Sequence, residues 1–237
     1  MEPIKIKHVA LECNWNNESI FKNAKTLVLG SFNPFNPKNV NADYYYGRKA
    51  NYFWKILAQL MGKPDHYFFQ NQKRKNEAML NFEFCFQDII DEISIEIKEE
   101  TGKSDDDIKH VRDFIDNNIF KDYSDQILFL SNSKKFNVKI TRVYNNKVIE
   151  LLKSLDFHTT MHTMGNDRIT KQLRVKPIEK KLLKLGFDGY MKEVVTLSKQ
   201  FVTTSYSPSQ IAVNQAKNTK EYKSDLRYWI GKHIIGY

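Results

Sequence analysis

The sequence predicts an α/β fold with a mostly parallel sheet and helices on both of its faces. Short buried strands alternate with amphipathic helices along 237 residues, and no internal repeat interrupts this alternation. With 41% apolar and 13% aromatic residues, the chain can bury one sizeable core. We therefore expect a single domain over residues 1–237, with residues 100–190 as the part that is open to elaboration.

Short apolar runs predict the strands. Lys25–Gly30 is the clearest of them, because an apolar run closed by a glycine is typical of a buried parallel strand. Ile127–Leu130 is a second buried run. Further strands are expected at Phe82–Phe86, Glu193–Leu197 and Phe201–Thr204.

Apolar side chains that recur every three or four residues predict the helices. The pattern is clearest in Ala50–Met61, which a glycine follows at the position that often ends a helix. Further helices are expected at Gln70–Leu80, Ile89–Glu99, Thr141–Leu155 and Pro177–Leu185, and at the C-terminal segment that carries Tyr222, Leu226, Trp229 and Ile230.

Composition narrows the classes of function. Lysine and arginine number 37 against 28 acidic residues, and the resulting net charge of +9 favours polyanionic partners without identifying one. Cys13 and Cys85 have no metal-ligand spacing, which argues against a disulfide scaffold, a zinc ribbon and an iron–sulfur cluster. No apolar stretch approaches the length of a membrane span. We expect a cytoplasmic, nucleoid-associated protein with no membrane partner.

The segment after the first predicted strand carries the most chemical information. It contains Gly30–Pro34, then Tyr44–Gly47, then Asn51–Trp54, and so combines a tight turn, tyrosines and two neutral amides. In open α/β sheets, ligands bind beyond the carboxyl ends of the strands, where this segment begins. A fixed carboxamide can orient a water or bind the edge of a base, and tyrosine rings offer a surface for a splayed-out base.

The run VLGSFNP…YYYGRKANYFWKIL resembles the first signature of the uracil-DNA glycosylase superfamily, and is most similar to its mismatch-specific uracil and hypoxanthine branches. The stretch TTSYSPS at 203–209 resembles the second signature, FEFCFQDIIDEI at 82–93 resembles an intermediate stretch, and Trp229 fits the C-terminal helix. The resemblance implies a three-layer α/β/α fold with a central, mostly parallel four-stranded sheet. It also implies a monomer that flips a deaminated base, hypoxanthine or uracil, out of DNA and hydrolyses its glycosidic bond without a cofactor or a metal.

The same resemblance implies roles for individual residues. Asn51 falls on the catalytic asparagine of the hypoxanthine branch and is preferred here, while Asn33 is the candidate for the water-positioning asparagine of the mismatch-uracil branch. Tyr46 falls on the aromatic residue that stacks on the flipped base. The implied base pocket consists of Gly30, Ser31, Phe32, Tyr46 and Phe53, and the implied contacts to the DNA backbone are Ser207, Pro208 and Ser209.

These residues also have structural interpretations. Asn51 would serve equally as a helix N-cap, the tyrosines at 44–46 as a core cluster, and the serines at 207–209 as an ordinary turn. His158 and His162 have an i, i+4 spacing but no acidic partner, so we expect no zinc site. Two other functions stay open: a catalytically silent DNA-binding protein of the same fold, and an enzyme that acts on free nucleosides or nucleotides.

Overall fold

A computed structural model describes residues 2–15, 17–30, 32–38, 41–97, 105–119, 138–154, 159–162, 189–190, 193–194, 202–204, 216 and 218–237. The chain divides into two compact units, each built from three separate segments. Unit 1 comprises Met1–Asn14, Ser31–Asn41 and Asp88–Asn145, and unit 2 comprises Trp15–Gly30, Ala42–Gln87 and Asn146–Tyr237. A single domain over residues 1–237 stays a prediction.

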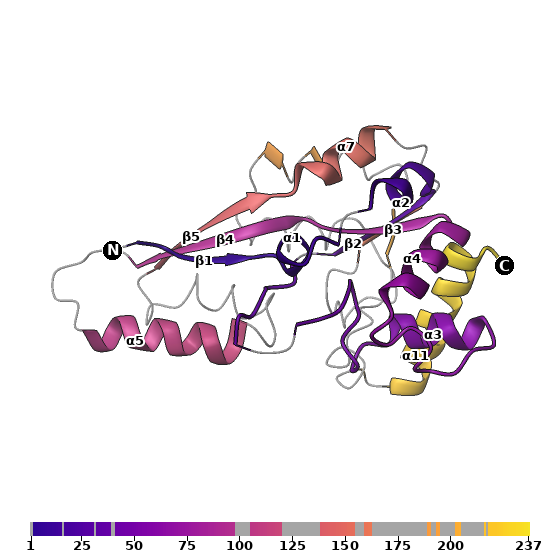
Figure 1. The fold of residues 1–237 in the computed structure, drawn as a ribbon, viewed down its shortest axis with the longest axis horizontal. Coiled ribbons are helices and arrows are strands. Elements are labelled where there is room, and N and C mark those ends of the chain that lie inside the picture. Colours follow the sequence, from indigo (N-terminus) through magenta and orange to yellow (C-terminus); the bar gives the residue numbers. More distant parts are fainter. Residues whose placement is uncertain are drawn as a thin grey trace. The chain divides into compact units, whose positions relative to one another are not determined.

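Unit 1 contains a three-stranded antiparallel sheet in the order β1-β4-β5 (Figure 1). Its strands are β1 (Ile4–Lys7), β4 (Ile90–Ile97) and β5 (Val138–Tyr144). In the register, Ile6 lies opposite Ile93, and both side chains are buried. The described helices of unit 1 are α1 (Val9–Glu12) and α5 (Asp105–Phe114), and α5 continues into a π-helical turn, η1 (Ile115–Ile119).

Two predicted helices are corrected by these strands. Residues Ile89–Glu99 were expected to be helical, yet β4 occupies Ile90–Ile97. Ile93 and Ile95 are fully buried at alternate positions, which is the two-residue period of a strand, and β-branched side chains favour it. The helix expected at Thr141–Leu155 is half wrong, because its first residues belong to β5.

The second sheet has four strands in the order β3-β2-β6-β7. These are β2 (Thr26–Gly30), β3 (Phe84–Asp88), β6 (Thr159–His162) and β7 (Val202–Thr204). Strand β6 pairs in parallel with both β2 and β7. All five residues of β2 are buried, in agreement with the continuous apolar run that predicted this strand.

The predicted fold class, a three-layer α/β/α domain around one central, mostly parallel four-stranded sheet, is wrong. The described strands are divided between two sheets, and the three-stranded sheet is antiparallel throughout. The prediction failed because it treated 89–99 as a helix and included no strand at the N-terminus. In the structure these two segments pair with each other instead.

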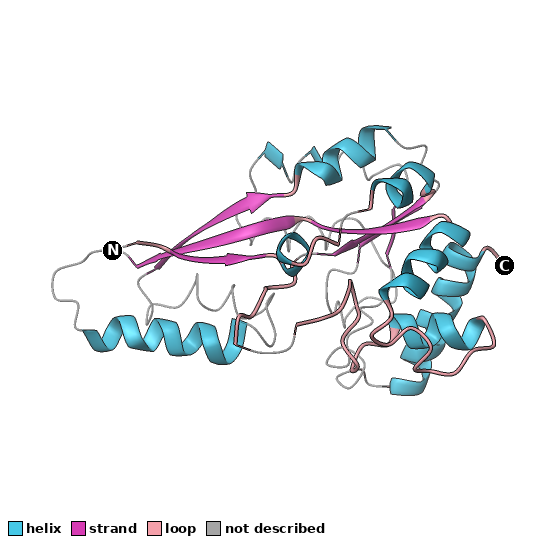
Figure 2. Cartoon of the chain, viewed as in Figure 1, coloured by secondary structure: helices cyan, strands magenta, loops and turns pink. Residues whose placement is uncertain are grey.

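The described helices of unit 2 include α2 (Glu18–Asn23), α3 (Phe53–Leu60), α4 (Gln72–Asn81), α7 (Asn146–Ser154) and α11 (Thr219–Ile230), with a π-helical turn η2 (Gly231–Ile235) after α11 (Figure 2). Helix α3 packs against α11, and α2 against α4. The helices expected at Ala50–Met61, at Gln70–Leu80 and at the C-terminus are confirmed with small shifts in their bounds.

Three other expected elements have different outcomes. Glu193 and Val194 are helical, so the strand expected from Glu193 is wrong at these residues. Ile127–Leu130 and Pro177–Leu185 lie outside the described residues.

Within the described part of the chain, no helix has the length and apolar character that crossing a bilayer requires.

Candidate functional site

An aromatic cluster lies between β3 and α3 in unit 2. It consists of Tyr45, Tyr46, Phe53, Trp54, Phe84 and Phe86. Phe86 is its hub, because the ring centroids of the other five members lie between 5.1 and 5.7 Å from its own. Offset and edge-on contacts of this kind stabilise a core beyond the burial of area alone.

Tyr46 differs from the other tyrosines of this segment. Tyr44 and Tyr45 are buried, whereas Tyr46 is partly exposed. Its φ of 53° lies in the left-handed region, which costs a non-glycine residue about 1–2 kcal/mol. Its ring stacks on Phe53 with a centroid distance of 5.8 Å and an interplanar angle of 24°. A strained backbone that presents a supported aromatic ring at the surface suits a stacking partner for a flat ligand.

Gly47 follows Tyr46 and closes a turn, since its N–H donates to the Tyr44 carbonyl at 2.8 Å. A Cβ atom at this position would lie 2.9 Å from both the nitrogen and the oxygen of Tyr44, and would overlap the Asp43 carboxylate. Only glycine therefore fits this backbone position. The turn fixes the direction in which Tyr46 leaves the main chain.

Asn51 lies at the start of α3 and uses one half of its carboxamide there. Its Oδ1 accepts a hydrogen bond from the Phe53 N–H at 2.9 Å, so the capping interpretation of Asn51 is correct. Its Nδ2 donates no hydrogen bond to any described residue, and the side chain is partly exposed. Asn51 thus keeps its Nδ2 donor in a fixed orientation, because its Oδ1 is held by the N–H of Phe53, the residue whose ring supports Tyr46.

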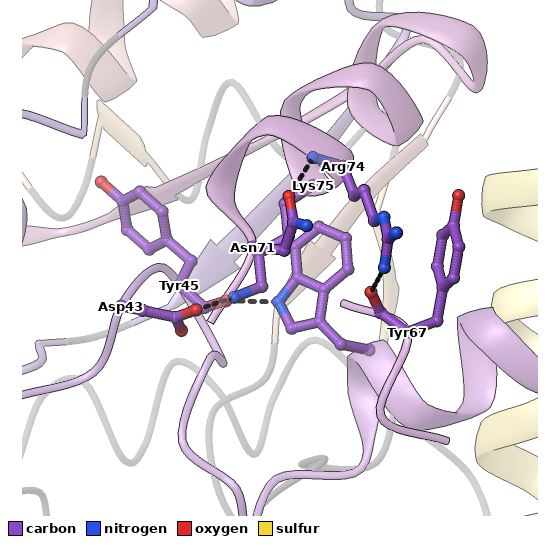
Figure 3. Close-up of polar contacts among 7 residues, drawn as sticks. Asp43, Tyr45, Tyr67, Asn71, Arg74 and Lys75 are labelled. Carbon is purple, nitrogen blue, oxygen red and sulfur yellow. Dashed lines mark hydrogen bonds and ion pairs between the residues drawn. The ribbon is translucent and has the colours of Figure 1, made fainter. Parts of the chain in front are cut away.

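An ion pair between a buried lysine and a partly exposed aspartate joins α4 to the tyrosine turn. The Lys75 ammonium of α4 contacts the Asp43 carboxylate, and only 1% of the Lys75 side chain is exposed (Figure 3). Burial lowers the pKa of Lys75 from its usual value, and the Asp43 carboxylate opposes this effect. The ammonium also lies 5.8 Å from the centre of the Trp54 ring, whose Nε1–H donates to the Tyr45 carbonyl at 2.7 Å.

Sequence reasoning missed the pair of Lys75 and Asp43. The segment QKRKNEAM reads like a solvated basic helix, and Asp43 lies 32 residues earlier in the chain. One signal was available. Lys75 precedes the buried residues Ala78 and Met79 by three and four positions, which places all three on one face of the helix.

The expected turn residues Phe32 and Asn33 lie in unit 1. Phe32 is buried, and its ring meets the imidazole of His8 edge-on at 5.5 Å. The Asn33 carbonyl accepts a hydrogen bond from the Val9 N–H at 2.8 Å, and Pro34 forms a bridge with His8. Backbone hydrogen bonds thus fix this turn against the end of β1.

His8 and Asp88 form a buried pair in the same unit. Because His8 Nδ1 accepts the Ala10 N–H at 3.0 Å, the ring proton lies on Nε2, which donates to Asp88 Oδ2 at 2.7 Å. Asn145 Nδ2 donates to the Asp88 carbonyl at 3.0 Å. Burial raises the pKa of the neighbouring Asp91 carboxyl; His8 lowers it and Asp88 raises it further. Both His8 ring nitrogens form hydrogen bonds within unit 1, so the pair of His8 and Asp88 stabilises the fold of this unit.

Among the expected site residues, Tyr46, Asn51 and Phe53 meet in unit 2, with Phe53 contacting both others. Gly30 is the buried last residue of β2. Phe32 and Asn33 belong to unit 1. Ser31, Ser207, Pro208 and Ser209 lie outside the described residues, so the expected approach of the serine–proline turn to the N-terminal turn stays a prediction.

Trp229, the C-terminal helix residue of the resemblance, is buried in α11, with its ring 5.1 Å from that of His233. Across the residues that the structure describes, no three His, Cys, Asp or Glu side chains are grouped to hold a metal ion.

No protein-family model matches this chain, and comparison with curated proteins and with solved structures also gives no match.

Proposed function

We propose that this protein is a monofunctional DNA glycosylase that removes a deaminated base, hypoxanthine or uracil, and leaves an abasic site. The observation that carries the proposal is the arrangement around Phe53. Its ring supports the partly exposed ring of Tyr46, and its N–H holds the carboxamide of Asn51. A stacking surface and an oriented amide donor are the two elements that recognition of a splayed-out base needs.

The reaction that this arrangement would catalyse needs few protein groups. Glycosidic cleavage passes through an oxocarbenium-like sugar, and the departing base carries the complementary negative charge. A fixed N–H donor that meets this charge stabilises the transition state, and one such donor contributes about 2.7–4 kcal/mol in a preorganised site. In this proposal the Asn51 Nδ2 is that donor, and the Tyr46 ring stacks on the base.

The resemblance of the run VLGSFNP…YYYGRKANYFWKIL to the first signature of the uracil-DNA glycosylase superfamily supports the same activity. The net charge of +9 suits a polyanionic substrate. Extruding a base costs a few kcal/mol and costs least for a mispaired base, which would supply part of the selectivity for deaminated bases.

The test is strand cleavage by alkali after incubation with duplexes that carry one uracil, deoxyinosine or xanthine. Wild-type protein should cut at least one of them. Asn51→Ala and Asn51→Ser should both lose activity, although serine keeps an oxygen that can cap α3. The matched control is Asn71→Ala, which removes the corresponding cap of α4 and should keep activity. Wild-type protein that cuts none of the duplexes at any salt concentration would contradict the proposal.

A catalytically silent DNA-binding protein is the second candidate, because the Asn51 oxygen already has a structural partner in the Phe53 N–H. This candidate predicts salt-sensitive binding to DNA, no turnover, and equal effects of Asn51→Ala and Asn71→Ala on stability alone. An enzyme that acts on free nucleosides would instead show turnover that does not depend on DNA length.

A further inference from the structure

Helices α3 and α11 pack side by side in unit 2 (Figure 1), and two lysines, one from each helix, lie close to one tyrosine ring. Tyr52 directly precedes α3, and the Lys55 ammonium of α3 lies 5.2 Å from the centre of its ring. The Lys223 ammonium of α11 lies 4.4 Å from the same centre. Tyr52, Lys55 and Lys223 are called the Tyr52 seam below.

The two lysines of the Tyr52 seam differ from eight other described lysines because they form no ion pair within the described part of the chain. Eight other lysines have a carboxylate within ion-pair distance: Lys7, Lys25, Lys38, Lys73, Lys75, Lys139, Lys147 and Lys153. Neither Lys55 nor Lys223 forms an ion pair with any described residue. Two acids of α11 lie two residues from Lys223: Asp225, and Glu221, which accepts a hydrogen bond from Asn218 at the helix cap.

Two like charges at one ring repel each other, so this arrangement concentrates positive potential that an anion would relieve. The faces of the tyrosine ring attract each ammonium group, which favours their positions at the ring. Arg227, one turn further along α11, donates to Gln59 of α3 at 3.2 Å and extends the basic row along the same contact.

We propose that the Tyr52 seam binds the phosphate backbone of duplex DNA through Lys55 and Lys223. Asn51 directly precedes Tyr52 in the chain, so the seam would hold the strand beside the amide that acts on the extruded base. This inference rests on the proposed function for its partner, while the binding itself requires no base removal.

The experiment measures binding of a labelled duplex without any lesion by fluorescence anisotropy between 50 and 300 mM salt (about the range over which phosphate contacts dominate the affinity). The full-length double variant Lys55→Gln/Lys223→Gln is compared with wild type. The slope of log affinity against log salt should become shallower by about 1.8, since each neutralised phosphate contributes about 0.9. Lys5→Gln/Lys22→Gln removes the same charge from two exposed lysines elsewhere and should leave the slope close to that of wild type.

An equal change of slope in the two double variants, or none in either, would overturn the seam, since only overall charge would then matter. Thermal unfolding of both variants shows whether the fold persists. If the seam variant unfolds, the single variants Lys55→Gln and Lys223→Gln should each make the slope shallower by about 0.9, and an unchanged slope in both would overturn the seam. Excision is assayed separately. A shallower slope without any base removal supports the seam and contradicts the glycosylase, and base removal with an unchanged slope does the reverse.

Discussion

The ammonium group of Lys75 contacts the carboxylate of Asp43 beneath the turn that presents Tyr46. The second carboxylate oxygen of Asp43 is buried without a hydrogen-bond partner. Removing Lys75 would therefore leave the Asp43 carboxylate without its ion-pair partner. Since the pair joins α4 to the tyrosine turn, its strength bears on both the stability of unit 2 and the position of Tyr46.

Replacing Lys75 by methionine should destabilise the protein by about 3 kcal/mol, because breaking a buried ion pair from one side leaves an uncompensated charge. Urea denaturation measures the change. The double variant Asp43→Asn/Lys75→Met should recover at least half of the loss. Lys73→Met, at a lysine that is 87% exposed on the same helix, should change the free energy of unfolding by less than about 0.5 kcal/mol. Equal losses at positions 73 and 75 would contradict a structural role for the pair.

Tyr46→Asn should reduce excision while Tyr46→Phe should keep it. Asparagine tolerates the left-handed backbone that the structure shows at this position, but it removes the ring. Base–aromatic stacking contributes about 1–3 kcal/mol, so kcat/KM should fall by about 5- to 150-fold. Tyr228→Asn, which removes a tyrosine that is 68% exposed, serves as the control and should leave kcat/KM unchanged. Unchanged excision in Tyr46→Asn would exclude Tyr46 as the stacking residue.

Asp91→Asn should raise the melting temperature at pH 7. Burial raises the folded-state pKa of Asp91 above its unfolded value of 3.8, so the folded state binds the proton more tightly than the unfolded state does. Stability due to this group is then present below pH 3.8 and is lost as the pH rises through the folded pKa. The advantage of Asp91→Asn over wild type should therefore shrink as the pH falls toward 3.8. An advantage that grows in acid would reverse this assignment.

The two cysteines should differ sharply in their reaction with a thiol reagent. Cys13 is exposed, whereas Cys85 is buried in β3, and burial raises the pKa of the Cys85 thiol well above its usual value. Because the thiolate is the reacting form, native protein should react with one equivalent of the reagent quickly and with a second equivalent only in urea. Cys13→Ser should abolish the fast phase. A fast phase that persists in Cys13→Ser would show that β3 opens under native conditions.

The sequence correctly predicted those elements whose own pattern of apolar residues is enough to identify a strand or a helix. Strand β2 is a continuous buried run, and α3 and α11 repeat their buried side chains at helical spacing. Strand β4 was predicted as a helix because Asp88 suits a helix N-cap, although the isoleucines of β4 alternate as in a strand, and β4 pairs with β1 and β5.

The candidate site followed the same rule. The resemblance of this segment to the first signature of the uracil-DNA glycosylase superfamily indicated Tyr46, Asn51 and Phe53, which lie within eight residues of one another. It did not indicate Lys75, whose partner Asp43 is distant in sequence, nor His8, whose partner Asp88 is 80 residues away. Single-sequence reasoning detects local groupings of chemically distinctive residues, and long-range pairs of ordinary charged residues escape it.

The hydroxyl of Thr26 at the start of β2 donates to the carbonyl of His233 at 3.2 Å, and α3 packs against α11. As the ribosome makes the chain from its N-terminus, both early elements must wait for more than 150 residues before their late partners emerge. Unit 2 is consequently among the last parts of the nascent chain to close. Its aromatic residues would be exposed to chaperones throughout that interval, and fragments that end before residue 219 should be captured by them.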